Sequence, residues 1–265
     1  MLTIAVTNQK GGVGKTTTTY HLARAAFRRE LRTLVIDLDP QGNLSDSLTE
    51  VEEKQAGMAD VLSASSSYGL DEVVVETTWN GVYLAPSGGD ALAVVRNELI
   101  TSGPGREMRL AEALRRLDGA PFDLVLIDCA PALDALTTNA FTAADGVLVV
   151  TQSRLYSATG LAHLLDAVEA VRAYYNPRLS VAGVLVNQHR ANTGQGKHWS
   201  GELASACQAR GLALLDPPVP DRVAISDSSE AGVGLDEWPG APAELVDVYD
   251  SHLAAVVAAL GGVGE

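Results

Sequence analysis

Residues 2–18 read LTIAVTNQKGGVGKTTT, and this stretch decides the fold. An apolar run typical of a strand leads into a glycine-rich loop, and a helix is expected to follow. Gly11, Gly12 and Gly14 let the backbone take positive φ and approach a ligand without a Cβ clash. Successive N–H groups of such a loop converge into a nest that binds anions. The stretch therefore predicts a phosphate-binding loop between a strand and a helix.

The match to the general P-loop pattern, Gly-x4-Gly-Lys-Ser/Thr, is loose at its first glycine. The bend Gln9-Lys10-Gly11, which contains Lys10, stands where that glycine usually lies. We expect Lys15 to reach the terminal phosphates and the Thr16 hydroxyl to bind Mg²⁺, beside the positive end of a helix dipole. The order of strand, glycines, Lys-Thr and helix argues against an ordinary glycine-rich turn. The residues expected to hold the nucleotide are Gly11, Gly12, Val13, Gly14, Lys15, Thr16 and Thr17.

Lysine is rare in this chain, which makes its placement informative. Four of the 19 basic residues are lysines, and two of them, Lys10 and Lys15, lie in this one loop. Two lysines in one loop are therefore not explained as ordinary solvated surface residues. Both are expected to act on phosphate.

Composition restricts the class of protein. The chain has 265 residues, of which 46% are hydrophobic and 20% charged, as in globular proteins. Neither a membrane-spanning run nor a secretory signal is visible. Cys129 and Cys207 follow no metal-binding spacing and suggest a reducing compartment. The net charge of −14 argues against strong, general binding of nucleic acid.

Apolar runs alternate with amphipathic stretches along the chain, which predicts a doubly wound, mostly parallel sheet with helices on both faces. No linker or repeat divides residues 1–265, so a single α/β domain is expected. The expected strands are Leu2–Val6, Thr33–Asp37, Val82–Ala85, Leu124–Asp128, Gly146–Thr151, Val181–Asn187 and Leu212–Leu215. The expected helices are Lys15–Glu30, Asp90–Glu98, Arg106–Leu117, Leu136–Ala143, Ala158–Tyr174, Ser200–Arg210 and Glu244–Leu260, with a short helix around Met58–Leu62.

Three carboxylates follow expected strands, at the edge where such sheets bind ligands. Asp39 is expected to hold or deprotonate a water near the γ-phosphate, and Asp37 to orient groups around Mg²⁺. Asp128 ends the apolar run Leu124–Ile127, so it is expected to accept hydrogen bonds from water bound to Mg²⁺. An Asp-Pro-x-Gly turn with solvated acids is the alternative for the first pair.

Together these motifs resemble those of the ParA family of partition ATPases, within the group of P-loop proteins that contains MinD. The resemblance covers Met1 to about Gly240. The matching stretches are KGGVGKTTT from Lys10, DLDPQGN from Asp37, DCAP from Asp128, TNA from Thr138, and VPDRV from Val219 with Ser226-Asp227.

The resemblance implies roles for several residues. Lys10 is similar to the signature lysine that crosses a homodimer interface to the partner's phosphates, so that two ATP molecules lie between two subunits. Asp39 matches the position that places the attacking water, and Thr16 matches the Mg²⁺ ligand. Asn187 resembles an adenine-reading residue, with a polar strand end as the alternative, and Pro220 lies in the segment near the adenine.

The resemblance further implies an ATP-bound dimer that binds DNA without sequence preference. It also implies a centromere-binding ParB-type partner and a cytoplasmic protein that associates with the nucleoid when ATP is bound. Relatives carry several arginines in the segment matching Asp221–Ser226, whereas one remains here. DNA contact is therefore expected to be weak and sensitive to salt. Its candidate residues are Arg190, Lys197, Arg210 and Arg222.

Two rival functions share this scaffold. A MinD-like membrane-associated ATPase needs a basic amphipathic C-terminal helix, but Glu244–Leu260 carries three acids and no Lys or Arg, so no membrane partner is expected. An ATP-dependent metabolic enzyme need not dimerise across ATP and so does not need the signature lysine. The presence of Lys10 therefore argues against that function. The chain has no helix-turn-helix before its first strand, so sequence-specific DNA reading is not expected. Turnover is expected to be slow, because no arginine finger is evident beyond the weak candidate Arg154.

Overall fold

The computed structural model describes residues 1–49, 55–117, 122–154, 157–190 and 194–262. Its strands are β1 Leu2–Thr7, β2 Thr33–Leu38, β3 Val75–Glu76, β4 Val82–Ala85, β5 Leu124–Cys129, β6 Gly146–Thr151 and β7 Ser180–Val186. Its helices are α1 Lys15–Arg28, α2 Asn43–Leu48, α3 Met58–Leu62, α4 Leu70–Val73, α5 Asp90–Thr101, α6 Arg109–Arg116, α7 Ala135–Ala143, α8 Ser157–Tyr174, α9 Gly194–Ala209, α10 Val223–Glu230 and α11 Ala243–Ala259, with a 3₁₀ turn η1 at Arg106–Met108.

The strands form one sheet in the order β3-β4-β2-β5-β1-β6-β7, and every pair but β3–β4 is parallel. This confirms the expected doubly wound, mostly parallel sheet. The order places β1 between β5 and β6, so the loop after β1 lies beside the ends of both neighbours. That position is where ligands bind in open α/β sheets.

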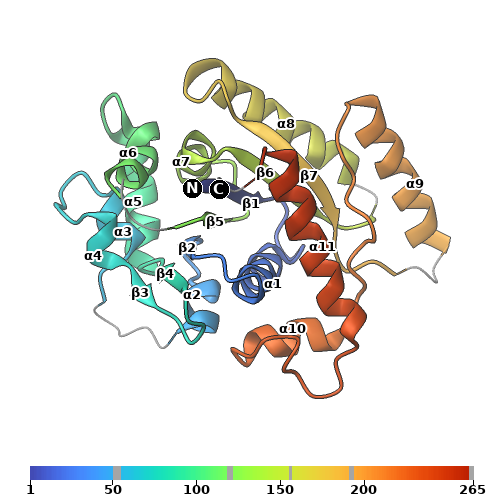
Figure 1. Cartoon of the computed structure of the whole chain (residues 1–265). Coiled ribbons are helices and arrows are strands. Elements are labelled where there is room, and N and C mark those ends of the chain that lie inside the picture. Colours follow the sequence, from blue (N-terminus) through green and yellow to red (C-terminus); the bar gives the residue numbers. More distant parts are fainter. Residues whose placement is uncertain (50–54, 118–121, 155–156, 191–193, 263–265) are drawn as a thin grey trace.

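Helices cover both faces of the sheet, as Figure 1 shows, with α1, α10 and α11 on one side and α6, α7 and α8 on the other. Alternate residues of one strand therefore enter different cores. In β5, Val125 and Ile127 join the core under α7, whereas Leu124 and Leu126 join the core under α1. Burial on both faces explains why these strands read as continuous apolar runs.

Three expectations about elements need correction. Leu212–Leu215 is not a strand, because it makes a single isolated bridge between Leu214 and Val184 and then meets prolines that cannot extend a ladder. The helix α10, Val223–Glu230, was not among the expected helices. The short elements α2, α4 and β3 were not expected. The short helix α3 and the strands β4 and β6 have the expected bounds.

α11 packs into the fold rather than lying free. Its buried residues Leu245, Tyr249, Leu253 and Val256 belong to the core that also holds the inner face of α1. Within the described ranges, none of the helices combines the length and the apolar character needed to cross a bilayer.

Candidate active site

The glycine-rich loop joins β1 to α1 at the carboxyl edge of the sheet. Gly12 has φ +70° and Gly14 has φ +85°, which explains the need for glycine at these two positions. Among the described residues, the backbone N–H groups from Gly11 to Thr17 donate no hydrogen bond within the protein. A run of free donors at the positive end of a helix is what a bound phosphate chain requires, so the loop fits a nucleotide.

Lys15 lies at the first position of α1 with 6% of its surface exposed. Its Nζ donates to the carbonyl oxygen of Lys10 at 3.4 Å, across the mouth of the loop. Burial lowers the pKa of Lys15, while the nearby carboxylate of Asp128 opposes that shift. A buried ammonium that faces free backbone donors gives this site two kinds of group that bind phosphate.

Asp128 is the last but one residue of β5, and its carboxylate contacts Thr16, the expected Mg²⁺ ligand. The Thr16 hydroxyl donates to Oδ2 of Asp128 at 2.7 Å, and Thr19 donates to Oδ1 at 3.4 Å. Burial, followed by the charge of Asp37 on neighbouring β2, raises the pKa of Asp128 to about 8. Two buried carboxylates with a hydroxyl ligand beside them form an environment that a divalent cation stabilises, so this site fits Mg²⁺.

Asp37 is fully buried and has hydrogen-bond partners of its own. Its Oδ1 accepts from the Asp39 N–H at 3.0 Å, and its Oδ2 accepts from the Ser45 N–H at 2.9 Å and the Ser45 hydroxyl at 2.7 Å. Burial raises the pKa of Asp37 to about 6 against these bonds. The structure thus gives Asp37 the role of an anchor for residues 39–45, and its expected place around Mg²⁺ stays a prediction.

Asp39 follows β2 and is half-buried at the same edge of the sheet. Its Oδ1 accepts the Gln41 N–H at 3.0 Å, so the carboxylate caps its own turn. Its N–H is held by Asp37, and its carbonyl oxygen accepts the Ser87 hydroxyl at 2.7 Å. The main chain of Asp39 is therefore fixed from both sides, while its carboxylate stays accessible.

Asn187 lies directly under the phosphate-binding loop with 3% of its surface exposed. Its Nδ2 donates to the Val13 carbonyl at 2.9 Å, and its Oδ1 accepts the Gln188 N–H at 2.9 Å. A Cβ added at Gly14 would lie 2.1 Å from the same Nδ2. These contacts make Asn187 a support of the loop, and its expected contact with adenine stays a prediction.

Two further amides support the loop. Asn8 donates to the Val150 carbonyl at 2.7 Å and accepts the Lys10 N–H at 2.9 Å, while Gln152 donates to the Gly12 carbonyl at 3.1 Å. Asn8 and Gln152 were not among the residues expected from the sequence, although each directly follows a strand, β1 or β6, which is a usable signal. Pro220 forms a bridge with His189 beyond β7, on the side of the sheet where Asn187 lies.

Lys10 is exposed at the tip of the loop. Its backbone is held by Asn8, while its side chain extends to the surface beside the mouth of the site. This placement leaves the ammonium accessible to a second molecule.

Two of the four residues expected to contact DNA, Arg190 and Arg222, bind the same residue, Asp221. Arg190 Nε donates to Asp221 Oδ2 at 2.6 Å, and the exposed Arg222 donates to the Asp221 carbonyl at 3.3 Å. Arg210 directly follows α9, a helix of 16 residues, whereas Arg190 lies before it in the chain. Lys197 belongs to α9, but its side chain lies outside the described residues.

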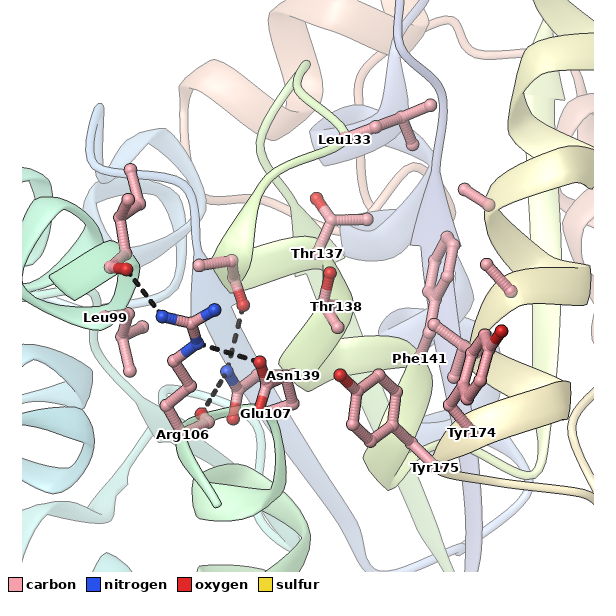
Figure 2. A pocket seen from close by; sticks show the side chains of 15 residues that line it. Leu99, Arg106, Glu107, Leu133, Thr137, Thr138, Asn139, Phe141, Tyr174 and Tyr175 are labelled. Atoms are coloured by element: carbon pink, nitrogen blue, oxygen red, sulfur yellow. Dashed lines mark hydrogen bonds and ion pairs between the residues drawn. The ribbon is translucent and has the colours of Figure 1, made fainter. Parts of the chain in front are cut away.

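Two hollows differ in their relation to this site. A cleft of about 460 Å³ adjoins the first turn of α1 and is lined by Thr16, Thr17, Tyr20, Asn43, Asp46, Ser47, Ser229 and Glu230. A second hollow of about 440 Å³ lies between α5, η1, α7 and α8, where Phe141, Tyr174 and Tyr175 face Arg106 and Glu107 (Figure 2). The first hollow is lined in part by Thr16, the expected Mg²⁺ ligand. The second is lined by no residue of the phosphate-binding loop.

Comparison with known proteins places the chain in a family. A family described as an AAA domain matches residues 1–181. The chromosome partitioning protein ParA of Caulobacter vibrioides is 36% identical over 233 residues, which cover 86% of this chain and 84% of that protein. The chromosome-partitioning ATPase Soj of Thermus thermophilus is 40% identical over 190 residues, 72% of this chain and 70% of its own length.

Solved structures share the fold. A complex of a McdA variant from Cyanothece with ATP has a TM-score of 0.85 and 25% identity, and covers 100% of this chain and 98% of its own. Cobyrinic acid a,c-diamide synthase from Mycobacterium smegmatis, with bound ADP and magnesium, has a TM-score of 0.76 and 33% identity. That match covers 89% of this chain and 91% of the synthase chain.

Proposed function

This chain belongs to the ParA family of P-loop ATPases, and from that premise we propose that it is a Mg²⁺-dependent ATPase that dimerises around ATP. In this proposal the ATP-bound dimer binds DNA without sequence preference. It drives the partition of a plasmid or chromosome with a ParB-type partner, as a cytoplasmic protein that joins the nucleoid when ATP is bound.

One arrangement supports the proposal above all others. Three features lie together at one edge of the sheet: buried Lys15, the free N–H groups from Gly11 to Thr17, and the Thr16–Asp128 pair. A fourth feature is Lys10, which is exposed in the same loop. The first three features suit a triphosphate with Mg²⁺. The fourth places a second cation where a facing subunit's phosphates could meet it.

Each side chain has one task in the proposed reaction. Lys15 and the loop N–H groups bind the β- and γ-phosphates, while Thr16 and Asp128 would hold Mg²⁺. Mg²⁺ would offset charge on the phosphate oxygens. Asp39 orients the attacking water, and Lys10 reaches the partner's phosphates. In-line phosphoryl transfer depends mostly on such positioning and charge stabilisation.

DNA binding in this proposal is weak. Arg190 is paired with Asp221, and the net charge of −14 repels a polyanion at long range. Arg222 and Arg210 are exposed, so they are the candidates for direct phosphate contact. Binding of DNA therefore needs the two copies of Arg210 and Arg222 that a dimer presents.

The test is the rate of ATP hydrolysis, measured alone, with DNA, with a candidate ParB, and with both. We expect a slow basal rate that rises when DNA and ParB are present together. Lys15→Ala is the control that removes hydrolysis under every condition. A rate that responds to neither DNA nor ParB would contradict the partition role.

A metabolic enzyme is the second candidate, and one observation favours it. The synthase chain from Mycobacterium smegmatis is 33% identical to this chain and covers 89% of it. An ATP-dependent ligase would couple hydrolysis to a carboxylate and an amine donor. Hydrolysis that depends on a small carboxylic acid substrate, and is unaffected by DNA, would favour this candidate.

The membrane-associated alternative has less support. The apolar face of α11 packs against α1, and its outer face carries Glu244 and Asp247. The large apolar residues of this helix are buried in the core, and its charge is unfavourable at an anionic membrane. Sedimentation with anionic vesicles and ATP should leave the protein in the supernatant.

A further inference from the structure

We infer that Ser87, two residues beyond β4, is a positioning residue for Asp39 and so sets the rate of ATP hydrolysis. The inference rests on the proposed role of Asp39 and deepens it. Ser87 belongs to neither the phosphate-binding loop nor the DLDPQGN stretch, and nothing in its local sequence marks it.

The sheet brings Ser87 to the site. β4 runs parallel to β2, with Ala85 level with Ile36, so the two strands end side by side. The chain beyond β4 therefore lies next to the loop that carries Asp39. Ser87 has 1% of its surface exposed, which means that its hydroxyl has no water to bind and must find a partner in the protein.

That partner is the main chain of Asp39. The Ser87 hydroxyl donates its one proton to the Asp39 carbonyl at 2.7 Å. The Ser87 N–H donates to the Ser45 hydroxyl at 3.1 Å, and the Ser45 hydroxyl donates to Asp37 at 2.7 Å. Since Asp37 also accepts the Asp39 N–H, the four residues close a ring of hydrogen bonds.

The ring fixes the conformation of Asp39. Pro40 follows, and a residue before proline is restricted to extended ψ values. The Asp39 N–H is bound to Asp37, and its carbonyl accepts both the Ser87 hydroxyl and the Gly42 N–H, the latter at 2.9 Å. Of these partners of the carbonyl, Gly42 belongs to the same turn as Asp39, whereas Ser87 ties the turn to the chain beyond β4. The direction of the Asp39 carboxylate is then set before substrate arrives, and a shift of about 1 Å in such a group can cost on the order of 100-fold in rate.

Ser87 is itself held in place from the other side. The Met58 N–H donates to the Pro86 carbonyl at 2.7 Å, and the Ala59 N–H donates to the Ser87 carbonyl at 3.2 Å. A Cβ on Gly57 would lie 2.5 Å from the Pro86 carbonyl, so α3 packs directly onto this turn. Ser87 is thus bound through its carbonyl to α3 and through its hydroxyl to Asp39, so it links the two.

The test compares Ser87→Ala with Ser87→Thr, which keeps the hydroxyl. We expect Ser87→Ala to lower kcat by about tenfold while the Kd for a non-hydrolysable ATP analogue stays within about twofold of wild type. Ser87→Thr should keep most of kcat. Ser180→Ala is the matched control, because its hydroxyl also donates to a backbone carbonyl, that of Asp145 at 3.4 Å, beside the opposite edge of the sheet.

Three results would overturn the inference: wild-type kcat in Ser87→Ala, equal losses in kcat and analogue affinity, or Ser87→Thr as slow as Ser87→Ala. Melting temperatures of all variants show whether they are folded. Asp39→Ala is measured alongside. If Asp39→Ala hydrolyses ATP at the wild-type rate, the assigned role of Asp39 fails, which is a different outcome from a failure of Ser87 alone.

Discussion

Single residues at the phosphate-binding loop act through contacts that the chain makes over long distances in sequence. Asn187 meets Val13 across 174 positions, and Gln152 meets Gly12 across 140. Each contact satisfies a carbonyl on the back of the loop and leaves the N–H groups on its front free for phosphate. The loop's shape therefore depends on amides contributed by β6 and β7.

Asn187→Ala tests this dependence. Because the side chain supports the loop, its loss should weaken ATP, GTP and inorganic tripolyphosphate by a similar factor, about tenfold. Tripolyphosphate carries no base, so it separates the two roles considered for Asn187. Titration calorimetry measures all three affinities. A loss confined to ATP, with tripolyphosphate binding intact, would assign Asn187 to the adenine instead.

Lys15→Ala should severely weaken nucleotide binding. The side chain is a buried ammonium beside the carbonyl of Lys10 and the carboxylate of Asp128, so no other cation replaces it. We expect ATP affinity to fall by about 100-fold, the size of a charge-assisted contact to phosphate. Calorimetry with Mg²⁺ present checks this. Retained affinity would contradict the role of Lys15.

The residues that the sequence predicted at this scale are those whose chemistry is local. The sequence motifs themselves indicate the roles of Lys15, Thr16 and Asp128. In the structure, Thr16 and Asp128 are hydrogen-bonded to each other. Ser87 and Gln152 lie outside these motifs. Their roles exist because β4 and β6 end near other strands, which periodicity along the chain does not reveal.

At the scale of elements, the central strands β1, β2, β5 and β6 were predictable, because all their residues are buried, which gives a continuous apolar run. The short elements were not predictable. α2, α4 and β3 are too short to show a period, and α10 starts in a stretch of mixed polarity. Tertiary contacts with α1, such as the bond from His21 to the Ile225 carbonyl, hold α10 in place.

His21 makes the packing of α1 against α10 and α11 sensitive to pH. Burial lowers the pKa of His21 to about 4, with the Ile225 carbonyl and Asp236 opposing the shift. Between pH 6.5 and pH 4, His21 is therefore mostly neutral in the folded protein and mostly protonated in the unfolded chain. Stability contributed by neutral His21 is complete above pH 6.5 and decreases as pH falls toward 4, by about 3 kcal/mol.

Urea unfolding between pH 4 and 7 measures this effect. His21→Gln is the comparison, because it keeps a donor for the Ile225 carbonyl and does not titrate. We expect the free energy of unfolding of the wild type to drop more steeply with acidification than that of the variant. Parallel pH curves for the two proteins would show that His21 does not titrate in this window.

At the scale of the whole molecule, charge limits the proposed contact with DNA. Asp221 neutralises Arg190 at the surface expected to meet phosphate. Asp221→Asn should therefore tighten DNA binding several-fold at low salt in the presence of ATP, and Arg222→Ala should weaken it. Electrophoretic shifts across a salt series measure both. Equal shifts for wild type and Arg222→Ala would remove Arg222 from the DNA contact.

The central claim is that two copies of this chain enclose ATP, each with Lys10 reaching its partner. Light scattering of Asp39→Ala with ATP and Mg²⁺ tests it most directly, since that variant should keep ATP bound. We expect a mass of twice 27.7 kDa with ATP and of 27.7 kDa without it, and a monomer in both conditions once Lys10→Ala is added. An ATP-loaded protein that stays monomeric with Lys10 intact would rule out the ATP-dependent dimer.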